Sequence, residues 1–350
     1  MRVKETTAKR NGYVELIRLI LAYMIAAMHF DESVYGAYLG VEFFFMLSGY
    51  YQMQQMRREG FSPLRYTVAR FLKLAFIYET STLLTALFDV NGADPALFLR
   101  RLYICLPDFL CLQMAGPFSL RLNPELWYVS AMMTAGFFLA LLYAAAPRHF
   151  RLIVPVLTIV GYGFLYQRYN WLAVNYLVRD CAIPSGTIRG LAGMSAGCWL
   201  SEGVEFVRKI PSGRKKSIVL SCLSLLSCGV CALIFFFKAA TPYDYYVVLC
   251  APPILLGALS GETLLSPWLN RLGQWTDAVL GRQFSFGLVS FTCVTILAAP
   301  LFVPYERLSR GASLAVFLLL VSLLSFVGAK AADVFNRKVV SRLVQKLYAV

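Results

Sequence analysis

Charged residues are scarce in this 350-residue chain: Asp, Glu, Lys and Arg make up 15% of it, and histidine occurs only twice. Soluble domains average about 25% charged and about 45–50% apolar residues, whereas 59% of this chain is hydrophobic and its mean hydropathy is +0.63. The apolar residues gather in stretches of roughly 18–24, the length that a helix needs to cross about 30 Å of hydrocarbon. The composition therefore excludes an ordinary soluble domain.

Regular alternation of polar and apolar residues is also missing, which excludes an outer-membrane barrel with its alternating strands of about ten residues. Backbone groups inside hydrocarbon have no water to bond, so the spanning segments should be helices. The sequence predicts an all-α polytopic integral membrane protein with about ten transmembrane helices. The expected spans cover about residues 13–30, 39–56, 70–88, 124–146, 150–167, 186–206, 217–238, 244–261, 282–303 and 311–331.

Acidic residues are few: 19 stand against 33 Lys and Arg, a net charge of +14. Cations collect in the cytoplasmic loops of membrane proteins, and here 22 of them fall on one side of the expected spans and eight on the other. This split predicts both termini in the cytoplasm, and no nucleic-acid partner is needed to explain the charge. Glu15 and Arg18 interrupt the first apolar stretch, which we interpret as a retained span rather than a signal peptide.

The expected spans form one transmembrane domain, residues 1–331, followed by a basic cytoplasmic tail, residues 332–350, that should lie at the membrane interface. The longest external segment, 89–123, holds an apolar piece that is too short to span. It is expected either on the surface or dipping into the protein as a cap. The nine cysteines lie mostly in apolar runs, where a free thiol behaves as a small hydrophobe. A disulfide between Cys105 and Cys111 is a minor alternative, and no metal is predicted.

Ionisable residues within spans are the candidates for chemistry, because each costs about 2.5–3.5 kcal/mol at a helix centre. Glu15, Arg18 and His29 belong to the first span. Arg18 and His29 are eleven positions apart, which places them within about 20° on one helix face and roughly 16 Å apart along the axis. Glu15 is spaced to pair with Arg18. His29 is a candidate general base; the alternative is an interfacial side chain at a span end.

The second span begins near Glu42, at a depth similar to that of His29. A carboxylate there could orient the imidazole and stabilise its protonated form; the alternative is a rim residue near water. Ser48 and Gly49 are better explained by tight helix packing than by catalysis.

Arg70 and Lys73 lie one turn apart at the inner end of the third span. Such a pair suits a polyanion such as a nucleotide phosphate, although cytoplasmic anchoring would explain it too. Glu125 and Trp127 open the fourth span and are assigned supporting roles.

Together these motifs resemble the acyltransferase 3 family of bacterial inner-membrane O-acyltransferases. The matching patterns are Glu15-x2-Arg18-x10-His29, Gly40-Val41-Glu42 through Ser48-Gly49-Tyr50, Arg70-x2-Lys73 and Glu125-Leu126-Trp127-Tyr128, with Arg189-Gly190 opening a Gly-rich sixth span. Lys73 stands where the family has Arg. Leu272-Gly273-Gln274-Trp275-Thr276 only loosely matches a late family pattern, and it lacks the histidine that many members carry shortly afterwards.

The resemblance implies transfer of an acyl group, often acetyl, from cytoplasmic acyl-CoA to an extracytoplasmic hydroxyl. The acceptor would be a carbohydrate or lipid-linked glycan of the cell envelope, as in surface polysaccharide modification. It assigns the donor to Arg18, Arg70 and Lys73, and the acceptor hydroxyl to His29 and Glu42. The alternatives are a non-catalytic transporter or binding module for a small polar substrate such as an amino acid, and a purely structural subunit that would leave the aligned residues of the first span unexplained.

Overall fold

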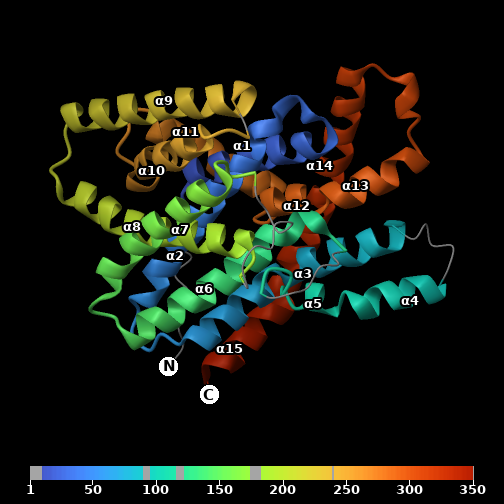
Figure 1. Ribbon diagram of the computed structural model, residues 1–350, viewed down its shortest axis with the longest axis horizontal. Helices are drawn as coiled ribbons and strands as arrows, with labels where there is room; N and C mark the ends of the chain where they lie inside the picture. The colour runs from blue at the N-terminus through green and yellow to red at the C-terminus, as the bar shows by residue number, and fades with distance from the viewer. Residues whose placement is uncertain (1–9, 90–94, 116–121, 174–182, 239, 350) are drawn as a thin grey trace.

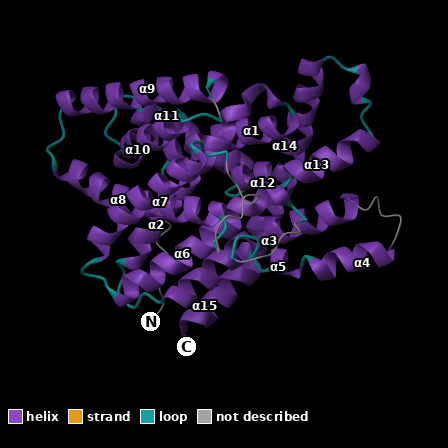
Figure 2. Ribbon diagram, in the orientation of Figure 1, coloured by secondary structure: helices purple, strands orange, loops and turns teal. Residues whose placement is uncertain are grey.

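The computed structural model describes residues 10–89, 95–115, 122–173, 183–238 and 240–349, and every regular element within them is a helix (Figure 2). The predicted all-α class is confirmed for this part of the chain. Its α-helices are α1 (Gly12–Phe30), α2 (Gly40–Met56), α3 (Pro63–Asp89), α4 (Pro95–Ile104), α5 (Leu106–Phe109), α6 (Trp127–Ala145), α7 (Phe150–Tyr169), α8 (Ser185–Lys209), α9 (Arg214–Phe237), α10 (Asp244–Ser260), α11 (Ser266–Leu280), α12 (Phe284–Ser290), α13 (Thr292–Ala298), α14 (Arg310–Phe335) and α15 (Ser341–Ala349).

Short turns join several of these helices: the 3-10 segments η1 (Glu32–Leu39), η2 (Pro124–Leu126), η3 (Ala299–Leu301) and η4 (Tyr305–Arg307), and the π-turn η5 (Asn336–Val340). Some residues used in the charge and cysteine analysis lie outside the described residues: Arg2, Lys4, Lys9, Arg121, Arg179 and Cys181.

The predicted number of spans is supported only in part. Every expected span is helical, but only six described helices are long and apolar enough to cross a membrane: α1, α3, α6 together with η2, α7, α9 and the continuous α14–α15 segment. A seventh would be α12 and α13, which are bent by 47° at a short break. Helices α2 and α10 have 17 residues each, and α8 is rich in Gly and Ser. The chain is a multi-pass membrane protein, and the expected count of ten is not confirmed.

Helix α8 passes through the middle of the bundle, where it lies against α2, α6 and α7 (Figure 1). Small residues allow the closest of these approaches. A Cβ atom added to Gly49 of α2 would lie 1.9 Å from the carbonyl oxygen of Met194, and one added to Gly197 of α8 would lie 1.9 Å from that of Met46. Real atoms cannot approach so closely, so the two backbones pack directly on each other. The predicted packing role of Gly49 is confirmed.

Helix α11 lies in the connection that the sequence analysis left between the expected spans 244–261 and 282–303. It is a helix of 15 residues that lies along α1. The two backbones approach as closely as α2 and α8 do: a Cβ atom added to Gly273 would lie 1.8 Å from the carbonyl oxygen of Gly12. The side chain of Asn270 accepts a hydrogen bond from the backbone of Tyr13 at 3.0 Å. These contacts fix the start of α1.

The described parts of the segment 89–123 combine both arrangements that its sequence allowed. Helix α4 projects at the side of the bundle and contains no buried residue (Figure 1). The residues after it turn inward, where Asp108, Gln113 and Met114 are fully buried. The Asp108 carboxylate accepts a hydrogen bond from the backbone of Leu122 at 2.7 Å, which ties this inward turn to the chain just before η2.

At the C-terminus, α14 continues through η5 into α15 and ends at the lower edge of the view in Figure 1. Since α14 extends to Phe335, the boundary expected at residues 331–332 falls inside a helix. The tail exposes four cations: Arg337, Lys338, Arg342 and Lys346. Its location at the membrane interface stays a prediction.

The close contact between α2 and α8 predicts opposite effects of the same substitution at two glycines. Gly-to-Ala changes in helices normally stabilise by about 0.5–1 kcal/mol, and Gly163→Ala should do so because nothing lies within 4 Å of the added atom. Gly49→Ala should instead destabilise the fold by about 1–3 kcal/mol through overpacking. Thermal unfolding of both variants in one detergent measures the difference, and equal midpoints would contradict the close approach.

Candidate active site

His29 and Glu125 form the central contact of the candidate site. The Nε2 atom of His29 lies 2.6 Å from Oε2 of Glu125. His29 stands in the last turn of α1, and Glu125 lies within η2, just before α6 begins. About a third of the imidazole is accessible (31%), against 11% of the glutamate side chain. A base that is held by a carboxylate and still reachable from one side is suited to proton transfer.

Local structure at both ends of the contact explains how it is held. Helix α1 ends directly after the histidine, where the N–H of Asp31 donates to the carbonyl of Ala27 at 2.7 Å. On the other side, Pro124 starts η2, and the backbone N–H of Trp127 closes that turn on the Pro124 carbonyl. The histidine and the glutamate therefore both project from the ends of helical segments.

Arg18 lies further along the same helix and forms the predicted pair with Glu15. Its Nη1 atom is 3.4 Å from Oε1 of Glu15. The aromatic residues Tyr51 and Tyr128 are near enough to interact electrostatically with the guanidinium. Glu125 and Tyr128 are close in the chain, so the η2–α6 segment places one polar group next to His29 and another near Arg18.

Glu15 has a second cation beside it. Arg10 lies 3.6 Å from the Glu15 carboxylate and 2.9 Å from that of Asp277 in α11. Burial raises the pKa of Asp277 above its usual range, although the neighbouring Arg10 opposes this effect. These carboxylates and Arg282 line a small cleft between α1 and the α11–α12 turn.

The expected contact between Glu42 and His29 is not formed. Glu42 is completely buried and is paired with Arg189 of α8, while the hydroxyl of Tyr162 in α7 donates to its other oxygen. The connection η1 is longer than a tight loop, and the first turn of α2 presents Glu42 to α7 and α8. The carboxylate beside the histidine is Glu125, which the sequence suggested only as a supporting residue.

Arg70 and Lys73 are positioned differently from each other on α3. Arg70 is half-buried, with Nη1 lying 3.3 Å from the side-chain oxygen of Gln52 and 3.4 Å from the hydroxyl of Tyr66. Lys73 is exposed, and its backbone carbonyl accepts a hydrogen bond of 2.5 Å from Gln283. Both cations remain candidates for binding an anion.

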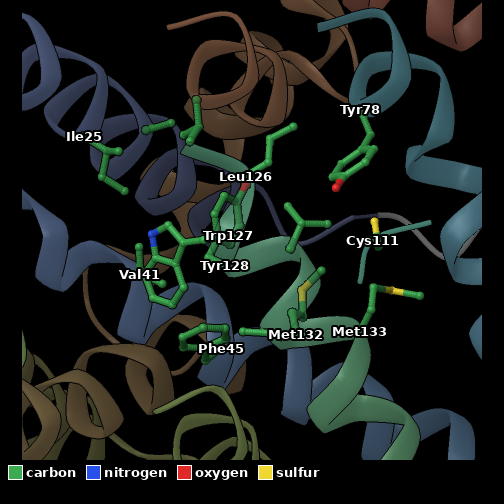
Figure 3. Packing of buried hydrophobic residues seen from close by; sticks show 14 of the residues in the cluster. Ile25, Val41, Phe45, Tyr78, Cys111, Leu126, Trp127, Tyr128, Met132 and Met133 are labelled. Atoms are coloured by element: carbon green, nitrogen blue, oxygen red, sulfur yellow. The ribbon is translucent and has the colours of Figure 1, made fainter. Parts of the chain in front are cut away.

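Two supporting residues from the sequence analysis pack inside the bundle. The hydroxyl of Ser48 donates to the sulfur of Met132 at 3.0 Å, a contact between α2 and α6. The ring of Trp127 is 6.1 Å from that of Phe45, and the labelled side chains of Figure 3 show Phe45 and Val41 beside it. Trp127 is thus embedded in the apolar core directly after the turn that carries Glu125.

Sequence reasoning missed the roles of Arg189 and Tyr162. Arg189 was noted only in the Arg189-Gly190 pattern that opens the sixth span, yet it is 1% exposed and pairs with Glu42. Its signal was present: a single cation in a Gly-rich apolar segment needs a buried partner. Tyr162 offered no such signal, because tyrosine is common in membrane helices.

The cysteine thiols that the structure describes are all free, including Cys105 and Cys111. Burial raises the pKa of Cys105 to about 11 and that of Cys111 to about 12, so both stay protonated at neutral pH. Helix α9 also carries a single Cys-x-x-Cys sequence, Cys228 to Cys231. Among the described residues, no group of three or more His, Cys, Asp or Glu side chains could hold a metal ion.

A comparison with known families gives a match over most of the chain. Residues 11–289 match the acyltransferase 3 family, whose description is "Acyltransferase domain". This range contains α1 to α11 and most of α12, and therefore every site residue that the sequence analysis proposed. No curated protein and no solved structure is similar to the chain.

The different surroundings of the two glutamates predict different effects on stability. Glu42→Ala leaves the Arg189 charge buried without its carboxylate, which should cost about 3–5 kcal/mol. Glu125→Ala should cost much less, because His29 can be neutral and is partly accessible. Unfolding curves in detergent measure both variants, and a Glu42→Ala protein as stable as Glu125→Ala would contradict the buried pairing.

Proposed function

The chain belongs to the acyltransferase 3 family, and on that premise we propose that it moves an acyl group such as acetyl from acyl-CoA to a hydroxyl group. The acceptor would be an extracytoplasmic or lipid-linked glycan, and the site of action the inner membrane of a bacterium. The observation that carries the proposal is the contact of 2.6 Å between His29 and Glu125. It supplies a general base together with the carboxylate that orients it.

The geometry of this contact supports a definite division of roles. Nε2 of His29 lies next to the Glu125 carboxylate, so in the proposed mechanism Nε2 carries the proton and donates to Glu125, while Nδ1 acts as the base. Nδ1 takes the proton of the acceptor hydroxyl as its oxygen attacks the thioester carbon. The carbon–sulfur bond then breaks, and the imidazolium returns the proton to the departing thiolate. Glu125 stabilises the imidazolium while it exists.

The donor would be held by the cations along α1 and α3. Coenzyme A carries several phosphate charges, which arginine binds through its planar fork and lysine as a point charge. Arg70 is partly held by Gln52 and Tyr66, so its guanidinium is already ordered before an anion arrives. Arg18 lies on the same helix as His29, which supports a path for the acyl chain between the phosphates and the base.

Acetyl-CoA labelled in its acetyl group and offered to inside-out membrane vesicles tests the function. We expect label on a glycan outside the cytoplasmic compartment with the native chain and none with His29→Ala. The matched control is His149→Ala, because His149 is the second histidine of the chain and is exposed at the start of α7. Glu125→Gln should slow transfer about 100- to 10,000-fold, the range of general base catalysis.

Two results would contradict the proposal. Full activity of a correctly inserted His29→Ala protein would remove the catalytic base. Uptake of an unmodified amino acid by vesicles, without any transfer of label, would indicate the transporter instead.

Binding of the donor provides a separate prediction. Arg18→Ala or Arg70→Ala should each weaken the binding of acetyl-CoA by about 10- to 100-fold, since a hydrogen bond to a charged group contributes about 1.5–3 kcal/mol. Arg101→Ala is the control, because Arg101 is far from Arg18 and Arg70 in the chain. Its guanidinium pairs with Asp89. Calorimetric titration of the solubilised protein measures the affinity, and unchanged values for both site variants would exclude them from the donor site.

A further inference from the structure

We propose that Arg189 is a positioning residue for the His29–Glu125 pair, because it clamps both segments of chain that carry the pair. The inference rests on the proposed function, since it concerns the geometry of that site. It explains why a charged residue is kept deep inside the bundle, away from the reacting groups.

Arg189 is held rigidly by its own partners. It is 1% exposed, and Nε donates to Oε1 of Glu42, which is itself inaccessible. Tyr162 donates to the second oxygen of Glu42. An ion pair in a medium of low dielectric constant is costly to separate, so the guanidinium has a fixed position between α2 and α8. It can therefore serve as a reference point for neighbouring segments.

The first clamped segment follows His29. The Nη2 atom of Arg189 donates to the carbonyl oxygen of Tyr38 at 3.0 Å, and Tyr38 lies in η1, which connects the histidine end of α1 to α2. The guanidinium carbon is also 5.8 Å from the centre of the Tyr38 ring. The far end of that ring is tied to α10, because its hydroxyl donates to Asp244 at 2.5 Å. The connection is thus held at both its backbone and its side chain.

The second clamped segment carries Glu125. The guanidinium carbon of Arg189 lies 5.4 Å from the centre of the Trp127 ring, a distance within the range of cation–π attraction. The backbone of Trp127 closes the turn that contains Glu125. A movement of the indole would therefore rotate the turn and displace the carboxylate from the imidazole.

Only an arginine can make all three contacts at once. Its planar group donates in several directions while its faces lie against aromatic rings. A lysine would keep the charge beside Glu42 but could not also reach the Tyr38 carbonyl and cover the Trp127 ring. Arg189→Lys therefore removes the contacts with the Tyr38 carbonyl and the Trp127 ring but keeps the buried positive charge.

A second arginine between α2 and α8 gives a matched control. Arg57, which directly follows α2, pairs with Glu202 and Glu205 of α8, and it contacts neither η1 nor η2. Arg57→Lys thus removes the same planar group from an ion pair between the same helices.

The experiment compares acetyl transfer by vesicles containing Arg189→Lys, Arg57→Lys or the native chain. For Arg189→Lys we expect kcat to fall about 10- to 100-fold, as for a misplacement of about 1 Å, with the KM for acetyl-CoA unchanged. The kcat of Arg57→Lys should stay within about twofold of the native value, because Arg57 contacts neither segment that carries the His29–Glu125 pair and its loss should not displace them. Combining Arg189→Lys with Glu125→Gln should lower kcat no further than Glu125→Gln alone, because the clamp acts through Glu125.

A native kcat for Arg189→Lys, or additive losses in the double variant, would overturn the clamp. If Arg189→Lys does not fold, Trp127→Phe tests the same connection, because it reduces the ring under the guanidinium and leaves the ion pair in place. Loss of kcat in that variant supports the proposal, and a native kcat overturns it. Retained activity of His29→Ala would instead contradict the proposed function, so the two failures are distinguishable.

Discussion

A charge that leaves water must find its partner inside the protein, and this constraint organises the bundle. Hydrocarbon offers no hydrogen bonds, so ionisable residues in spans face the interior and pair with one another. Glu42 and Arg189 meet this requirement completely, since both are buried and each has additional polar contacts. Their pairing fixes the relative position of α2 and α8, and α1, α6, α7 and α10 pack against one or both of these helices.

Small residues make this pairing possible. Because α2 and α8 touch backbone to backbone at Gly49 and Gly197, the side chain of Arg189 reaches Glu42 without crossing a gap. Such close contact requires small residues, which lower the apolar content of α8. For this reason α8 does not have the composition of an independent membrane span. Helices with ordinary spanning composition, such as α9 and α14, expose large apolar side chains at the outside instead.

The sequence predicted what depends on local geometry. The helical class, the pairing of Glu15 with Arg18 and the packing role of Gly49 all follow from residues that are close in the chain or from the spacing on one helix. The partners of His29 and Glu42 could not be derived in this way. Glu42 and Arg189 are 147 positions apart, and which helix faces meet depends on the packing of the entire bundle. Depth alone placed Glu42 near His29, but the rotation of α2 turns it toward α8. The helix α11 was missed because it contacts α1 through small and polar residues such as Gly273 and Asn270, while the prediction searched for long apolar stretches.

The bend between α12 and α13 also reaches the candidate site. The side chain of Asn123 donates to the carbonyl of Ser290, the last residue of α12, at 2.9 Å. Asn123 directly precedes the turn that contains Glu125. This hydrogen bond therefore joins the bend to the turn, although they are far apart in the chain. The position of the Glu125 carboxylate therefore depends in part on a helix break that itself carries none of the proposed reacting groups.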